Sequence, residues 1–146
     1  MTEKGKSLET TLHRWLTELD IYFHRFYDSK SFGRVGTARP SDFWCYLNNR
    51  LILIECKEHK GKSLPFNAFQ PSQYKGYFKA VKHDVLYIAL VHFTDEDLLY
   101  AVKMCYIVDS ARLKERKSMP ISFFIEKGNK IEDKNDLLLV LKGVPL

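Results

Sequence analysis

Three charged residues interrupt an otherwise apolar stretch of the sequence: Asp42, Glu55 and Lys57. Asp42 comes directly before the run FWCYL, and the other two lie at the end of the run LILIECK. Both runs are typical of β-strands. The Asn48–Asn49 pair between them favours a tight hairpin turn, because asparagine tolerates a positive φ.

Such a turn determines which residues face each other. It pairs Leu47 with Arg50 and, counting outward, Asp42 with Glu55. Directly opposed residues on antiparallel strands point to the same face, with Cβ atoms ~4.5–5.5 Å apart. Two buried carboxylates need a proton or a cation between them. A divalent ion that prefers oxygen ligands, Mg²⁺ or Mn²⁺, meets this need.

Lys57 lies two residues after Glu55 and therefore shares its face of the strand. Two carboxylates that hold a metal beside a lysine are suited to attack by water on a phosphodiester, because the metal lowers the pKa of a bound water. Lys57 could orient that water or stabilise the transition state, and the backbone carbonyl of Cys56 could be a further metal ligand. The alternative is a structural Glu55–Lys57 ion pair where the strand emerges into water.

The spacing of these residues is similar to a known pattern. Ser41-Asp42, followed thirteen residues later by Glu55-Cys56-Lys57, resembles the PD-(D/E)XK nuclease motif. Within that superfamily the chain resembles Holliday junction resolvases, especially the RecU-like group, and it also resembles the archaeal resolvases. The resemblance implies a restriction-endonuclease-like core in which both acids bind metal and the lysine is catalytic.

Two further segments contribute to the resemblance. Residues 5–9, GKSLE, resemble the motif that opens the first helix of resolvases, which implies that Glu9 joins the metal site directly or through water. Residues 64–73, LPFNAFQPSQ, resemble a stretch whose glutamine lies near the active site. Gln73 is the best match and Gln70 is a rival. Glu9 could instead only favour a helix dipole, and either glutamine could be an ordinary polar surface residue.

The net charge is +5, and residues 50–82 contain seven basic residues against two acidic ones, an excess equal to that of the whole chain. Such clustering suggests a polyanionic partner. Four residues flank the proposed site in the sequence and could bind DNA phosphates without reading base sequence: Arg34, Arg39, Lys60 and Lys62. A solvated basic surface is the alternative.

The surrounding pattern predicts one domain over residues 1–146, with elements in the order α-β-β-α-β-β that form a mixed central sheet flanked by helices. Helices are expected at residues 7–26, capped by Ser7, and at 67–82, with Pro71 in the first turn. Further predictions are strands at 43–47, 51–57, 85–93 and 99–108, loops at 28–41 and 58–66, a short helix at 110–117, a strand and turn in ISFFIEKGNKI, and either state for LLLVL.

Composition excludes several classes of protein. Hydrophobic residues make up 45% of the chain, and no apolar run is long enough to span a membrane. The N-terminus lacks an apolar signal region, which indicates an intracellular protein, and the compact chain suggests a phage or mobile element as its source. Three scattered cysteines indicate reduced thiols.

Three functions are therefore open. The first is a metal-dependent, structure-selective endodeoxyribonuclease, specifically a Holliday junction resolvase. The resemblance implies that such an enzyme acts as a homodimer on four-way DNA junctions, with one site per protomer. The second is a restriction or repair nuclease of the same fold. The third is a basic DNA-binding module whose carboxylates are structural.

Overall fold

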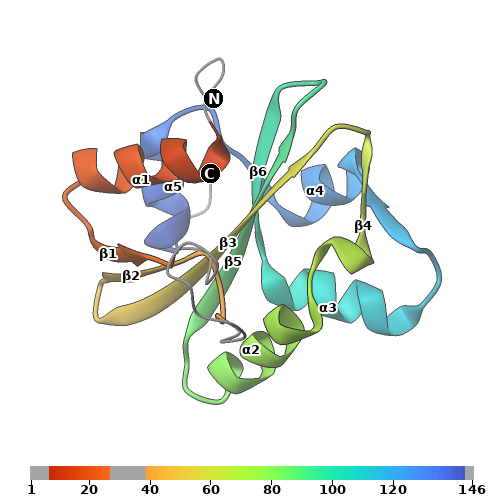
Figure 1. Ribbon diagram of the computed structural model, residues 1–146, viewed down its shortest axis with the longest axis horizontal. Coiled ribbons are helices and arrows are strands. Elements are labelled where there is room, and N and C mark those ends of the chain that lie inside the picture. Colours follow the sequence, from red (N-terminus) through yellow and green to blue (C-terminus); the bar gives the residue numbers. More distant parts are fainter. Residues whose placement is uncertain (1–6, 27–38, 144–146) are drawn as a thin grey trace, which may run out of the picture.

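A six-stranded sheet forms the centre of the computed structural model, which describes residues 7–26 and 39–143. The strand order is β1-β2-β3-β5-β6-β8; β3 and β5 run parallel, and the other neighbours are antiparallel. The predicted mixed sheet flanked by helices is confirmed (Figure 1). The strand bounds are β1 Tyr22–Arg25, β2 Phe43–Leu47, β3 Arg50–His59, β5 Leu86–Phe93, β6 Leu98–Lys103 and β8 Asn129–Lys130.

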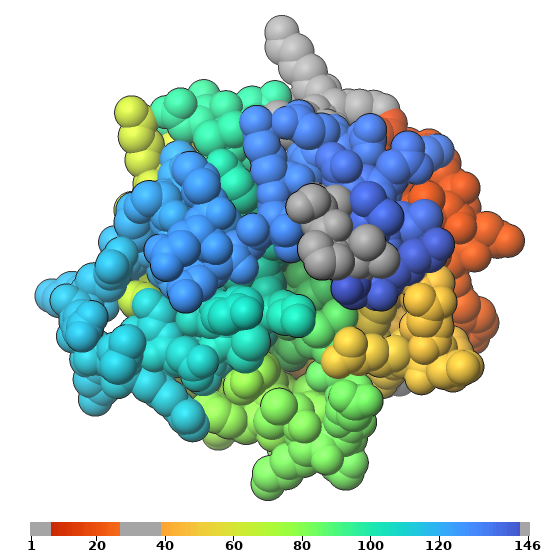
Figure 2. Space-filling view, turned by 180° about the vertical axis from the view of Figure 1, so that it is seen from behind, coloured from red at the N-terminus to blue at the C-terminus, as the bar shows by residue number. Residues whose placement is uncertain are grey.

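Helices cover both faces of this sheet. On one face lie α1 (Leu8–Glu18) and α5 (Lys134–Leu141); on the other lie α2 (Pro71–Val81), α3 (Met104–Leu113) and α4 (Ile121–Lys127) (Figure 1). Seen from behind, the cyan and blue residues of the C-terminal part form much of the surface (Figure 2). None of the helices in the described ranges has the length and apolar character needed to cross a bilayer.

Two short strands and a 3-10 helix connect the segment before α2 with the C-terminal part of the chain. A short two-stranded sheet pairs β4 (Ser63–Pro65) with β7 (Ser118–Pro120), and the 3-10 helix η2 (Phe66–Ala68) leads from β4 towards α2. The predicted loop at 58–66 is therefore partly wrong, because β3 continues to His59 and β4 follows it. Pro71 does occupy the first turn of α2, as predicted.

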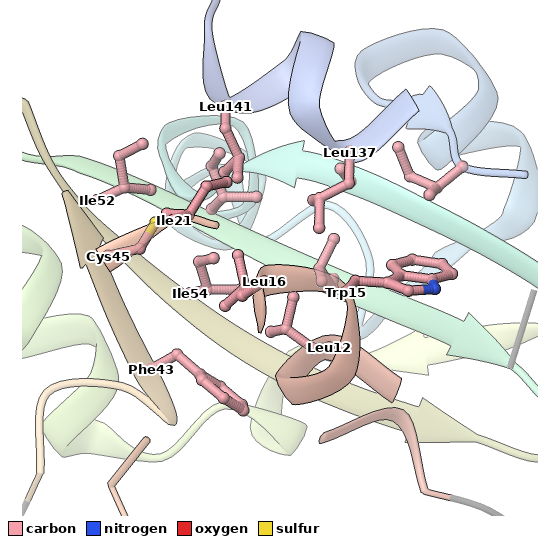
Figure 3. Close-up of a cluster of buried hydrophobic side chains, with 14 of the residues drawn as sticks. Leu12, Trp15, Leu16, Ile21, Phe43, Cys45, Ile52, Ile54, Leu137 and Leu141 are labelled. Carbon is pink, nitrogen blue, oxygen red and sulfur yellow. The ribbon is translucent and has the colours of Figure 1, made fainter. Parts of the chain in front are cut away.

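The first hydrophobic core holds α1 and α5 against the sheet (Figure 3). Leu12, Trp15 and Leu16 of α1 are spaced to lie on one side of the helix, and they pack with Leu137 and Leu141 of α5. The α1 helix begins where predicted, because the Ser7 hydroxyl oxygen accepts a hydrogen bond from the backbone N–H of Thr10. This packing determines where the start of α1 lies relative to β3.

The second core lies on the opposite face, beneath α2, α3 and α4. Its members include Tyr87 and Val91 from β5, Phe69 before α2, Ile107 from α3 and Phe124 from α4. Since both faces are covered, every residue of β5 is buried. A continuous apolar run was therefore a reliable indicator of this strand.

The hairpin of β2 and β3 has the predicted turn and register. Asn48 and Asn49 have φ values of 54° and 60°, as a two-residue turn with positive φ requires. Leu47 pairs with Arg50, and the register continues to Phe43 and Ile54.

The first predicted helix is too long. α1 ends at Glu18, Asp20 takes a left-handed φ of 55°, and β1 then pairs antiparallel with β2. Phe23 has the spacing of a residue on the apolar side of the helix, but it packs against the first core from β1. Pairing with β2, which lies far away in the sequence, decides this segment.

The C-terminal half also differs from the prediction. The strand expected at 99–108 ends at Lys103, and α3 takes residues 104–113. ISFFIEKGNKI contains the helix α4 rather than a strand with a turn, apart from the two-residue β8 at its end. LLLVL, left ambiguous, is in α5. These short apolar runs are compatible with either state, and packing against the sheet selects the helix.

Candidate active site

The site begins where β3 extends beyond the end of β2. Phe43–Ile54 is the last pair, so the next N–H of β3 on that edge, that of Cys56, has no strand partner. The Asp42 carboxylate takes that place, with 2.8 Å from Oδ2 to the Cys56 nitrogen. The Asp42 N–H donates to the Ile54 carbonyl at 3.1 Å, so the chain bends here and Asp42 does not pair directly with Glu55 as predicted.

The two carboxyl groups nevertheless meet. Asp42 and Glu55 are 3% and 2% exposed. Burial raises the pKa of Glu55 to about 9, and hydrogen bonding and charge repulsion from Asp42 act in the same direction. The Oε2 atom of Glu55 is buried without a hydrogen-bond partner. A carboxyl group in this state needs a proton or a cation.

Two basic side chains balance these acids. Lys57 Nζ lies 3.6 Å from Glu55 Oε1 and 5.2 Å from the centre of the Phe69 ring, so the two residues share a face as predicted. The guanidinium of Arg39 lies 3.0 Å from Asp42 Oδ1 and donates to the Phe26 carbonyl at 2.9 Å. The structure thus pairs Arg39 with a site carboxylate, and its predicted contact with DNA phosphates stays a prediction.

A third carboxylate comes from the first turn of α1. Glu9 hydrogen-bonds with Asp42, and burial followed by the charge of Asp42 raises its pKa. Arg25 of β1 lies 3.6 Å from Glu9 Oε2. Glu9 of α1 and Glu55 of β3 thus each approach Asp42, which directly precedes β2.

Within the described ranges, no three His, Cys, Asp or Glu side chains have the arrangement of a complete metal site. The fit to a metal rests instead on the chemistry of the donor atoms, which are carboxylate oxygens. Glu55 Oε2 is buried without a hydrogen-bond partner, and the Glu55 carboxyl group contacts Asp42. In a strand the N–H and C=O of one residue point to the same edge, so the Cys56 carbonyl lies on the Asp42 side. This set suits Mg²⁺ or Mn²⁺.

One positioning residue was missed by sequence reasoning. Glu58 Oε1 accepts a hydrogen bond from the N–H of Leu8 at 3.1 Å, and so holds the start of α1 beside Glu9. Buried His92 lies 3.9 Å from the same oxygen and contacts Asp97 at 2.9 Å. Glu58 lies three residues after Glu55, so the period of a strand places the two side chains on opposite faces. The contact of Glu58 with α1 could not be predicted, because it depends on tertiary packing.

One of the two candidate glutamines makes a structural contact. Gln73 is buried, and its Oε1 accepts a hydrogen bond from the Gln70 N–H at 2.8 Å, which closes the first turn of α2. Gln70 is exposed. A role of Gln73 near Lys57 stays a prediction, and burial favours it over Gln70.

The remaining predicted residues lie at the edges of the site or outside the described ranges. Lys60 is exposed just beyond the end of β3, and Lys62 Nζ lies 3.6 Å from Glu96 Oε1 on the surface. Arg34 lies outside the described ranges. Cys45, Cys56 and Cys105 are free cysteines, as predicted.

The fold is shared with a solved structure of a Holliday junction resolvase. The crystal structure at 1.6 Å resolution of Archaeoglobus fulgidus Hjc, a Holliday junction resolvase from an archaeal hyperthermophile, matches with a TM-score of 0.59 and 12% identity over 88% of this chain and 94% of that one. At this low identity the match shows that the two chains share a fold.

A search of curated proteins found no significant match. The profile of the family "RecU: Recombination protein U" matches residues 29–144. The chain therefore belongs to the RecU family of Holliday junction resolvases.

Proposed function

We propose that this protein is a Mg²⁺- or Mn²⁺-dependent endonuclease that cuts four-way DNA junctions as a homodimer. The observation that carries the proposal is the buried contact of Asp42 and Glu55, beside Lys57 and with Glu9 within hydrogen-bond reach of Asp42. Two buried carboxyl groups in contact, one of which is kept from ionising by its surroundings, provide a place for a divalent cation.

Each residue has a distinct role in this proposal. Asp42, Glu55 and the Cys56 carbonyl would hold the metal, and Glu9 would complete the site directly or through a water. A metal held there would supply Lewis-acid chemistry, making a bound water more acidic and drawing charge from the scissile phosphate. Lys57, anchored between Glu55 and the Phe69 ring, orients the attacking water or stabilises the added negative charge.

DNA binding is proposed to depend on cations around the site. Lys60 and Lys62 follow β3 directly, and Arg39 is partly exposed beside Asp42. Arg34 is included from its place in the sequence. Their contacts with phosphates position DNA of any base sequence.

The test compares cleavage of a four-way junction and of linear duplex with the same sequence, in Mg²⁺, in Mn²⁺ and with a chelator. We expect junction cleavage that needs the metal, loss of cleavage in Asp42→Ala and Glu55→Ala, and retained junction binding in both variants. Equal cutting of both substrates would favour a general nuclease. Unchanged DNA processing by the two variants would favour a binding module with structural carboxylates.

The homodimer is tested separately by sedimentation of the free protein and of its junction complex. Two opposed strands must be cut to resolve a junction, so two sites related by a two-fold axis are expected. A complex containing a single protomer that still cuts both strands would contradict the dimer.

A further inference from the structure

An aromatic stack crosses the two strands at the β1 edge of the sheet. The Trp44 ring lies between two others: its centre is 5.5 Å from that of Tyr22 and 6.1 Å from that of His24, with interplanar angles of 27° and 28°. Pairing of His24 with Trp44, and of Tyr22 with Tyr46, brings these side chains together. We call Tyr22, Trp44 and His24 the aromatic stack.

The stack is anchored at its centre and open at one end. Trp44 packs partly against the second core, whereas Tyr22 is 73% exposed and the neighbouring Tyr46 is 49% exposed. Cross-strand ring contacts alone would stabilise the sheet edge. They do not account for leaving the rings of Tyr22 and Tyr46 in water, and grouped exposed aromatic side chains mark binding sites.

The stack lies close to the active site, which indicates what kind of ligand it could bind. Trp44 pairs with Leu53, and Glu55 lies two residues further along the same face of β3. The Phe26 N–H donates to the Asp42 carbonyl at 2.8 Å, so the end of β1 borders the site. His24 lies two residues before Phe26. At ~3.3 Å per residue, the stack begins roughly 7 Å from Asp42. A DNA strand whose phosphate reaches the carboxylates would therefore place a neighbouring base beside the aromatic stack.

Positive charge lies on the same side of the sheet. The α2 helix covers the face that carries Leu53, and its Lys75 and Lys79 are exposed. It also approaches the residues before Asp42 closely: a Cβ on Gly76 would lie 3.2 Å from the Pro40 carbonyl oxygen. A nucleic-acid strand on this face would thus meet stacking surfaces and basic side chains together, as in single-strand binding sites.

We propose that the aromatic stack binds one unstacked base of the DNA strand held in the active site, with Tyr22 supplying the outer stacking surface. This inference rests on the proposed function. In a linear duplex every base is stacked and paired, whereas bases at a branch point can be displaced at lower cost. The stack therefore contributes to the preference for branched DNA.

The experiment measures binding to a junction that carries the fluorescent base 2-aminopurine at the branch point, to linear duplex and to a single-stranded oligonucleotide with the same label. Metal is omitted so that no cleavage occurs. Wild-type protein is compared with Tyr22→Ala, Tyr22→Phe and His24→Ala. Tyr106→Ala, which removes a partly exposed tyrosine on α3, is the matched control. Thermal unfolding establishes that each variant is folded.

We expect Tyr22→Ala to bind the junction and the single strand about 5- to 100-fold more weakly. Linear duplex binding should be unchanged, and the fluorescence quenching of the label should be lost. Tyr22→Phe and the Tyr106→Ala control should behave like the wild type.

Two results would overturn the inference: wild-type affinity and quenching in both Tyr22→Ala and His24→Ala, or a shift of Tyr22→Ala from dimer to monomer, which would make the stack an interface between copies. Failure of the proposed function appears differently, because the wild type would then not discriminate or cut the junction. The single-strand measurement would still test the stack.

Discussion

Lys57 is the only lysine that the structure places against the buried carboxylate pair, among the residues it describes. Its ammonium group contacts Glu55 and the Phe69 ring, so it is held in place before any substrate binds. This preorganisation is what a group that stabilises transition-state charge requires.

We predict that Lys57→Ala lowers the single-turnover rate of junction cleavage by about 100-fold or more, by analogy with the loss of one preorganised donor. Junction affinity should change little, because one phosphate contact is a small part of the total. Lys60→Ala is the control and should affect binding rather than rate. A cleavage rate within a few-fold of the wild type would remove Lys57 from the mechanism.

The raised pKa of Glu55 determines how stability depends on pH. Folded Glu55 keeps its proton up to a pKa of about 9, while the unfolded chain loses it near the ordinary value of 4.5. Unfolding therefore releases a proton between these limits. The resulting stability is fully present below about pH 4.5 and is lost as pH rises towards 9.

Between these limits we expect the free energy of unfolding of the metal-free protein to fall with pH by up to ~1.4 kcal/mol per unit. Glu55→Gln removes this slope because its amide does not titrate, and Glu126→Gln, at an exposed position, should leave the slope unchanged. Denaturant titrations at pH 5, 6.5 and 8 measure it. Equal slopes in the wild type and in Glu55→Gln would show that Glu55 is already ionised.

At the scale of elements, α1 matters because it carries Glu9 to the site. The helix is held by its apolar side in the first core and, at its first residue, by the hydrogen bond from the Leu8 N–H to Glu58. β3 thus carries Glu55 and Lys57 on one face and Glu58, the anchor for α1, on the other.

Glu58→Ala should lower the free energy of unfolding by about 1 kcal/mol, the usual cost of losing a side-chain acceptor at a helix start. Because Glu9 would be held less firmly, the Mg²⁺ concentration for half-maximal cleavage should rise several-fold. Glu58→Gln keeps an acceptor oxygen and should restore both. Wild-type stability and metal dependence in Glu58→Ala would assign the position of α1 to core packing alone.

The elements show where sequence reasoning succeeds and where it does not. The hairpin turn and the β5 strand were predictable because positive φ at Asn48 and Asn49 and a continuous apolar run are local signals. β1 and α4 were not, because their states depend on packing partners. β1 needs β2 to pair with, and α4 needs the second core.

At the scale of the whole molecule, the exposed basic residues lie around the proposed site, and its centre is made of carboxylates. Arg39 and Lys57 lie against the two buried carboxylates, whereas Lys60 is exposed and Lys62, in a surface contact with Glu96, is 80% exposed. We therefore expect Lys60 and Lys62 to make most of the phosphate contacts in the proposed complex. Each such contact releases condensed counterions from DNA and makes affinity depend on salt.

The double variant Lys60→Ala, Lys62→Ala should therefore reduce the slope of log affinity against log salt by about 1.8, or ~0.9 per lost contact. The matched control is Lys130→Ala, Lys142→Ala, which removes the same charge at β8 and at the end of α5. Junction binding between 50 and 200 mM salt gives the slopes. The same reduction in both variants would mean that net charge, rather than position, governs binding.

The sequence by itself determined much of the centre of the site: a two-asparagine turn sets the hairpin register as far as Phe43 and Ile54, and the strand period places Lys57 on the same face as Glu55. These relations are local, since one short turn and the strand period specify them. Tertiary structure decided the rest. Glu9 reaches Asp42 because α1 packs on the sheet through the first core, and Arg39 neutralises Asp42 because the chain bends where β2 begins. Such contacts depend on how separate elements pack, and no local pattern of residues encodes that packing.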